Sequence, residues 1–292
     1  MSDPKQLIAQ AESLQKPQSG FMLLFTGSSN SYRLEEATDL YVQAANMYRL
    51  KKDFNSAGKL YVKASEIQDK LGNHNDVANH LVEAYKCFKG VSPQDGITSL
   101  KKAVHIFLTQ NGQFRRAANF MGDLGELYES VGDTENAISS YEQAGDYFQT
   151  DRAEALSNKA YLKSADLCAL QGDYKKAVEL YDTVIKQLLG NNLTRFSMKD
   201  YFFKVILCVL AMDDIIEARK RNDTFLGDEP TWESTREYKL VNEILESIDQ
   251  GDIDGFQDKV FEFDQFSKLD KLKTQLLLKI KDTVDKDDED LL

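Results

Sequence analysis

The sequence of 292 residues lacks features that mark several classes of protein. It has only four prolines, at positions 4, 17, 93 and 230, so long segments are open to uninterrupted helices. No stretch approaches the roughly 20 apolar residues that a membrane-spanning helix needs. The first residues, MSDPKQLIAQAESLQ, also lack the basic and then apolar segments of a signal peptide. We therefore expect a cytoplasmic protein.

Cysteine is scarce and unpaired by number. The three cysteines, Cys87, Cys168 and Cys208, are widely spaced and lie in apolar helical patterns. An odd number of cysteines in such surroundings indicates reduced core residues rather than a disulfide framework.

Motifs that carry chemistry are missing as well. The sequence has no GxxxxGK[ST] loop, no GxSxG, no HExxH and no CxxC. The segment DQGDIDGF (249–256) resembles the start of a calcium loop, but that register would place Phe261 where a bidentate glutamate is needed. We expect a turn between two helices there, no metal, no cofactor and no enzymatic activity.

The charge is unevenly distributed. The net charge is −12, and residues 1–200 carry 23 Lys+Arg against 25 Asp+Glu, while residues 201–292 carry 13 against 23. An acidic last third repels nucleic acid and anionic lipid and attracts a basic partner. We therefore expect no nucleic-acid binding.

What the sequence does contain is a repeat of about twenty residues. Turn signals recur at 71–76, 111–117, 131–137 and 171–177, each around a glycine. In LKKDFNSA, Lys52 stands where a glycine would fit the same grid, and VSPQDG (91–96) supplies another turn. This spacing leaves room for helices of roughly 16 residues, each about 24 Å long.

Within the repeats, small alanines alternate with aromatic residues at helical spacing, as in AISSYEQAGDYF (137–148). This pattern predicts an all-α, TPR-like solenoid of antiparallel helix pairs over 1–190. The grid fades after residue 190, and 198–222, 232–250 and 252–284 each have a helical pattern. We expect a C-terminal helical bundle over 191–284 and an acidic, mobile tail over 285–292.

Three features exceed what a plain solenoid needs. The first is the apolar run Phe21, Met22, Leu23, Leu24 and Phe25, fenced by glycines and serines. It suits either a short element packed under the first repeat or an exposed loop, and the flanking residues favour the loop.

The second is the i, i+4 pair Lys159 and Lys163, with Arg152 expected upstream on the same stripe. A lysine stripe is usually a solvated helix face. The same spacing recurs at Lys52, Lys59 and Lys63, five grid steps earlier, which predicts opposite layers for the two sets. We favour the later set as a binding surface.

The third is the acidic end, where two leucines follow a run of carboxylates that either binds a partner or only solubilises the chain. The run consists of Asp287, Asp288, Glu289 and Asp290, followed by Leu291 and Leu292.

Taken together, the sequence resembles the alpha-type soluble NSF attachment proteins, the SNAP adaptors of membrane fusion, and most of all the yeast-type member of that family. The resemblance covers the whole chain and rests on GFMLLF (20–25), NMYRLKKDFNSAG (46–58), SNKAYLKSADL (157–167), SMKDYFFK (197–204), EFDQFSKLD (262–270) and the terminal DDEDLL.

The resemblance implies an adaptor that binds the assembled SNARE four-helix bundle and recruits and stimulates the hexameric AAA ATPase NSF, which takes the bundle apart. It implies that Phe21 to Phe25 attach to the membrane surface, so that the cytoplasmic protein associates peripherally with membranes. It implies NSF contacts for Asp287, Asp288, Glu289, Asp290 and Leu291.

For the SNARE contacts, the resemblance implies Lys52, Arg115, Arg116, Lys159 and Lys163. Many family members have a basic residue where this chain has Asn119, which puts the SNARE footprint near Arg115 and Arg116 in question. The alternatives are a generic TPR-like peptide-binding scaffold and a gamma-type relative with another SNARE preference.

Overall fold

The computed structural model describes residues 3–16, 30–110, 112–190 and 195–289, and of residues 195 and 285–289 it describes the backbone alone. In these ranges the chain forms α-helices and one 3-10 helix and no strand, which confirms the all-α class. It divides into two compact units, Met1–Ser157 (unit 1) and Asn158–Leu292 (unit 2). This boundary lies inside a helix, whereas the sequence pattern places a domain boundary near residue 190, and that division stays a prediction.

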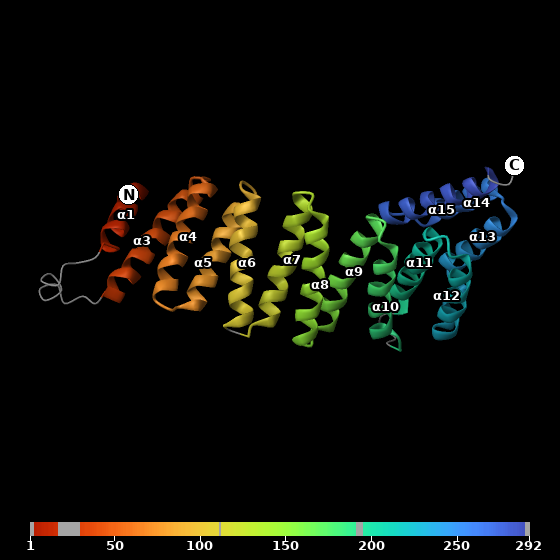
Figure 1. Ribbon diagram of the computed structural model, residues 1–292, viewed down its shortest axis with the longest axis horizontal. Helices are drawn as coiled ribbons and strands as arrows, with labels where there is room; N and C mark the ends of the chain where they lie inside the picture. Colours follow the sequence, from red (N-terminus) through yellow and green to blue (C-terminus); the bar gives the residue numbers. More distant parts are fainter. Residues whose placement is uncertain (1–2, 17–29, 111, 191–194, 290–292) are drawn as a thin grey trace, which may run out of the picture. The chain divides into compact units, whose positions relative to one another are not determined.

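Unit 1 is a stack of antiparallel helices in which each helix packs against the next one in the chain (Figure 1). The helices of the repeats have 15 to 17 residues, close to the length that the sequence predicts. The helices are α1 (Pro4–Leu14), α3 (Asn30–Leu50), α4 (Phe54–Lys70), α5 (His74–Phe88), α6 (Pro93–Thr109), α7 (Phe114–Ser130) and α8 (Thr134–Thr150). The next helix, α9 (Glu154–Leu170), begins in unit 1 and ends in unit 2.

Alanine allows these helices to approach closely. Ala37, Ala44 and Ala64 are fully buried where α3 and α4 pack, and the aromatic rings fill the space between the backbones. The ring of Phe88 lies against Gly58, where an added Cβ would come within 2.5 Å of it. The alternation of small and aromatic residues in the sequence therefore determines how closely the helices of the stack pack.

One turn geometry repeats between the helices. In Gly132 and Gly172 the backbone is left-handed (φ 78° and 86°), the amide donates to the carbonyl three residues earlier, and the next residue is an aspartate that caps the following helix. Lys52 has the same left-handed geometry (φ 61°), and its amide likewise donates to the carbonyl three residues earlier, which confirms its predicted place on the grid.

Arg152 is also such a turn residue (φ 57°), so it does not lie on the exposed stripe of α9 with Lys159 and Lys163. The prediction of one continuous stripe is wrong. The turn has no glycine to reveal it in the sequence, and the helix begins only at Glu154.

Unit 2 contains elements of less regular length, from 5 residues in its 3-10 helix to 19 residues in its last helix. After the end of α9 come α10 (Tyr174–Leu188), α11 (Arg195–Ala211), α12 (Ile215–Asp228), the 3-10 helix η1 (Pro230–Ser234), α13 (Arg236–Gln250), α14 (Ile253–Phe266) and α15 (Lys271–Glu289). The segments 198–222 and 252–284 are thus two helices each, not one. The first break lies at Asp213, which is left-handed and precedes the cap Asp214. At the second break, Asp264 accepts from the amide of Leu269 after the end of α14, and Asp270 accepts from the amide of Lys273 at the start of α15.

The centre of unit 2 is α11, which is buried without interruption from Phe202 to Ala211. It packs against α10, α12, α13 and α15. Trp232 in η1 is buried as well, and its indole nitrogen donates to Asn222 Oδ1 at 2.9 Å. The three cysteines are buried thiols, as predicted.

Candidate functional site

The residues singled out by the sequence fall into different surroundings. The apolar run 21–25 and the terminal residues Asp290 and Leu291 lie outside the described residues. Residues 287 to 289 belong to the last turns of α15, and their side chains are not described.

Two of the predicted basic residues of unit 1 are largely occupied by contacts inside the unit. Arg115 is exposed, and its Nε donates to Asp151 at 2.5 Å. Arg116 is half-buried, donates from Nη2 to Asn79 Oδ1 at 2.7 Å, and stacks with its guanidinium carbon 4.2 Å from the ring centre of Phe107. Arg116 therefore contributes to the packing of the stack, and a role in binding stays a prediction.

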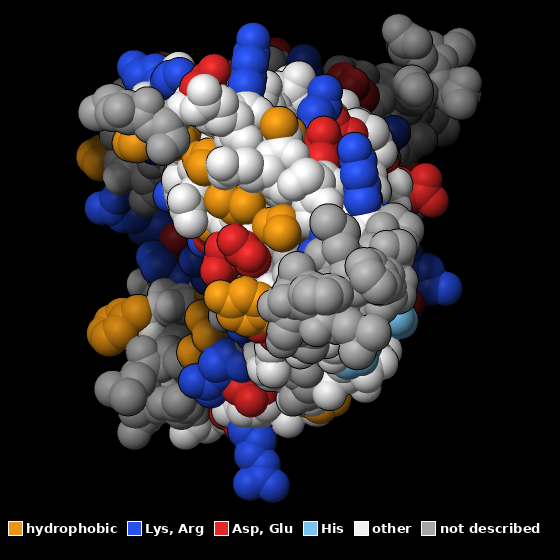
Figure 2. All heavy atoms as spheres, turned by 90° about the vertical axis from the view of Figure 1, so that its left-hand side faces the viewer, with side chains coloured by type: hydrophobic (Ala, Val, Ile, Leu, Met, Phe, Trp, Pro, Cys, Tyr) orange, Lys and Arg blue, Asp and Glu red, His pale blue; other side chains and the backbone are white. Residues whose placement is uncertain are grey.

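Lys52 is exposed at the turn between α3 and α4. It lies in unit 1, as do Arg115 and Arg116. Figure 2 views the end of unit 1 that carries α1 and α3, and hydrophobic, basic and acidic side chains are mixed there. Both signs of charge on this face agree with the near balance of residues 1–200.

Lys159 and Lys163 are the basic residues that the structure does bring together. Both are exposed and one turn apart on the part of α9 that belongs to unit 2, while Tyr161 and Ala165 on the other side of the helix are buried. The face predicted from their spacing is present. It carries two ammonium groups one helical turn apart.

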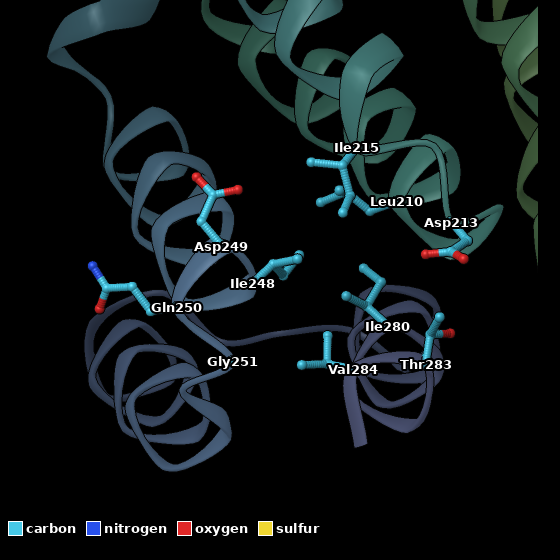
Figure 3. Close-up of a pocket in the computed structure, with 10 residues that line it drawn as sticks. All are labelled: Leu210, Asp213, Ile215, Ile248, Asp249, Gln250, Gly251, Ile280, Thr283 and Val284. Carbon is cyan, nitrogen blue, oxygen red and sulfur yellow. The ribbon is translucent and has the colours of Figure 1, made fainter. Parts of the chain in front are cut away.

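A second feature was not predicted from the sequence. At one end of unit 2, the turns α11–α12 and α13–α14 and the helix α15 enclose a cavity of about 310 Å³. Figure 3 shows apolar side chains from four helices turned toward one another, with two carboxylates at opposite edges. The apolar residues are Leu210, Ile215, Ile248, Ile280 and Val284, and the carboxylates belong to Asp213 and Asp249.

The cavity suits a particular kind of side chain. Its branched apolar residues are suited to an aliphatic stem, and the carboxylates at its edges are suited to a positively charged group. Asp249 accepts from Arg219 and keeps more than half of its side chain exposed, at 57%. The consecutive aspartates 213 and 214 before a helix were the available signal, because they fit the turn pattern of the repeats without its glycine.

The described residues contain no group of three His, Cys, Asp or Glu side chains placed to hold a metal ion. None of the described helices is long and apolar enough to cross a membrane. The fold and these two features define a class: a TPR-like helical repeat protein with an exposed basic pair on α9 and a cavity edged by carboxylates in unit 2.

The chain belongs to the soluble NSF attachment protein family. The model described as "Soluble NSF attachment protein, SNAP" matches residues 2–285. The chain is 45% identical over 294 residues to the "Vesicular-fusion protein SEC17" of Komagataella phaffii, covering 100% of this chain and 98% of that protein. It is 44% identical to the "Alpha-soluble NSF attachment protein" of Saccharomyces cerevisiae, with 100% of both chains covered. The human protein of that name is 36% identical over 98% of this chain and 96% of its own. These matches confirm the family that the sequence motifs indicate.

Proposed function

We propose that this chain is a non-enzymatic adaptor that binds the assembled SNARE four-helix bundle and recruits and stimulates an NSF-type AAA ATPase, so that the bundle is taken apart during vesicle fusion and membrane traffic. The observation that carries the proposal is the match of the SNAP family model to residues 2–285. The relatives that cover the whole chain are named for vesicular fusion and NSF attachment. The adaptor is cytoplasmic and associates peripherally with membranes.

The direct test is capture of an assembled SNARE bundle by the purified chain, followed by addition of NSF and ATP. We expect capture, recruitment of NSF and release of free SNAREs, with no turnover by the chain alone. A generic TPR-like scaffold would capture a peptide without recruiting the ATPase. Capture without recruitment or disassembly would therefore contradict the proposal.

Lys159 and Lys163 are assigned to the SNARE bundle, because they form an exposed basic pair on one turn of α9. Reversing both to Glu turns two attractions into repulsions, which costs about 2–5 kcal/mol if the contacts are desolvated and about 0–1 kcal/mol each if they stay wet. The matched control reverses Lys175 and Lys186, two exposed lysines of α10 in the same unit. Unchanged capture by the Lys159/Lys163 variant at low salt would refute the assignment, since salt screening is then weak.

The membrane contact is assigned to Phe21 to Phe25. Support comes from the helices that border this segment. Arg33 of α3 is buried and donates from Nη2 to the carbonyl oxygens of Ser13 and Lys16 at 3.4 and 3.3 Å, which ties the carboxyl end of α1 to the start of α3. A few large apolar side chains provide weak, reversible attachment and raise the effective concentration of a docked adaptor.

Replacing Phe21 and Met22 with Ser should lower SNARE disassembly only when the SNAREs are anchored in a bilayer. Soluble SNARE bundles are the control, and an equal loss with them would show that the run packs against protein instead.

The acidic cavity of unit 2 and the end of the chain are assigned to the ATPase, because the balance of −10 in residues 201–292 attracts a basic partner and speeds association. Leu291 is given a separate role: an apolar tip that biases the ATPase toward its working state. Leu291→Ala should recruit NSF nearly normally and stimulate ATP hydrolysis poorly. Changing Asp287, Asp288 and Asp290 to Asn should instead lower affinity and its dependence on salt. Normal disassembly by Leu291→Ala would show that the end of the chain only solubilises.

A further inference from the structure

A chain of ion pairs runs through unit 2 and ends on α15. Asp166 of α9 accepts from Lys204 Nζ of α11 at 2.9 Å, and the same ammonium lies 3.4 Å from Asp200 Oδ2. The other oxygen of Asp200 accepts from Lys273 Nζ of α15 at 2.5 Å, and Lys273 also contacts Asp270 at 3.0 Å. The charges thus alternate in sign from α9 through α11 to α15.

The two ammonium groups of this chain are shielded from water, with side chains only 9% and 14% exposed for Lys204 and Lys273. Burial alone lowers the pKa of Lys273, but the hydrogen bond and the charge of Asp200 outweigh burial, so that its pKa lies above the usual value. The pKa of Lys204 is raised in the same way, chiefly by Asp166. Tyr181 of α10 anchors the far end, because its hydroxyl donates to Asp166 at 2.5 Å.

The apolar contacts of α15 fix its position along the helix axis less strictly than the ion pair with Asp200 does. Leu272, Leu276 and Ile280 are buried and follow one another every four residues. A slide of α15 by one turn, about 5.4 Å, would put one of these side chains near the place of the next. The ion pair has no such repeat, since a slide of one turn would carry Lys273 away from Asp200. Buried polar pairs fix register in this manner in other helical assemblies.

We propose that Asp200 and Lys273 are positioning residues that fix the register of α15 against α11, and that this register shapes the acidic cavity for the ATPase. Ile280, Thr283 and Val284 of α15 line that cavity, so that a shift of α15 would deform it. The part of this inference that concerns the ATPase rests on the proposed function.

The test compares Lys273→Met, which keeps the volume and removes the charge, with Lys273→Arg, which keeps the charge. The matched control is Lys279→Met, at an exposed position of α15 that has no ion pair within the described residues. Hydrogen exchange of the α15 amides reports on the register, and the α13 amides report on the stability of the whole unit. ATP hydrolysis by NSF at saturating adaptor is measured separately from the adaptor concentration needed for half-maximal recruitment.

For Lys273→Met we expect exchange in α15 to rise about tenfold with α13 unchanged, and stimulated hydrolysis to fall about fivefold. Lys273→Arg and Lys279→Met should behave as the unmodified chain. Asp200→Asn should match Lys273→Met, and the double variant should be no worse than either single variant.

Unchanged exchange in α15 would overturn the register lock. Faster exchange with normal stimulation would overturn its link to the ATPase. If the unmodified chain fails to recruit NSF, the proposed function is wrong, while the exchange measurement still decides whether the ion pair fixes the register.

Discussion

Asp213 combines a strained backbone with a place at the edge of the acidic cavity. Its φ of 63° is left-handed, in a turn where Gly132 and Gly172 serve elsewhere in the chain. Its amide donates to Leu210 O at 2.9 Å, so the turn is held in this conformation. A left-handed residue other than glycine costs about 1–2 kcal/mol, less for aspartate than for most residues.

We predict that Asp213→Gly raises the free energy of unfolding. Relief of about 1 kcal/mol of strain is offset by about 0.4–1 kcal/mol of extra chain entropy in the unfolded state. The net gain is up to about 0.6 kcal/mol, or a melting temperature higher by up to about 2 °C. Lys52→Gly should gain more, because lysine tolerates a left-handed backbone less well than aspartate does.

Chemical denaturation measures the change in the free energy of unfolding, provided that the slope of this free energy against denaturant concentration is the same for the variant and the unmodified chain. A lower free energy of unfolding for Asp213→Gly would refute the reasoning, because it would mean that the carboxylate contributes more than the strain costs.

The same position separates backbone from charge. Asp213→Asn keeps a residue that tolerates the left-handed conformation and removes the charge at the cavity. It should weaken NSF recruitment by about 0.5–1 kcal/mol, a factor of about 2 to 5. Asp258→Asn removes the same charge from an exposed position of α14 outside the cavity, and it should change recruitment less. Equal effects of the two variants would show that net charge alone, and not the cavity, guides recruitment.

Two further predictions concern the folded state. Gly125→Ala should lower the free energy of unfolding by about 1–3 kcal/mol, because the added Cβ would lie 2.6 Å from the buried ring of Tyr141. Gly122→Ala on the same helix meets open space and should raise the free energy of unfolding by up to about 1 kcal/mol. Thermal unfolding of the two variants checks this, and equal shifts of the melting temperature would contradict it. The three thiols are buried and should not react with a thiol reagent at pH 8 until the chain is denatured, because burial raises the pKa of Cys87 and raises that of Cys208 to about 12. A count of reactive thiols in native and denatured protein measures this. Rapid labelling of a thiol in the native protein would contradict the buried positions.

The repeat of unit 1 could be predicted from the sequence because its information is local. A left-handed residue followed by an aspartate cap ends one helix and starts the next within a few residues, as at Gly132–Asp133. Left-handed turn residues other than glycine are harder to recognise, which explains the missed turns at Arg152 and Asp213. At both positions the helical spacing of apolar residues continues on either side of the turn. Apolar periodicity alone therefore does not show that one helix ends and another begins there.

The candidate sites were less accessible from the sequence. The exposed pair Lys159 and Lys163 follows from helical spacing alone. The surroundings of Arg116 do not, because Asn79 is 37 positions away, and the partner of Lys204 is 38 positions away. The segment SMKDYFFK (197–204) contributed to the family resemblance, yet only the fold shows that its Asp200 and Lys204 join α9 to α15.

Charge therefore acts at two distances in this protein. At long range the balance of −10 in residues 201–292 sets the field that a basic partner meets, and buried lysines count in it as much as exposed ones. At contact distance only accessible groups matter. The side chains of Lys204 and Lys273 are shielded from water, while the side chain of Asp200 remains 39% exposed. In the proposed mechanism, the buried lysines order the helices and the exposed carboxylates are available to the ATPase. The rate of recruitment should thus follow the net charge, while its specificity should follow the few acidic side chains that the helix register brings to the cavity.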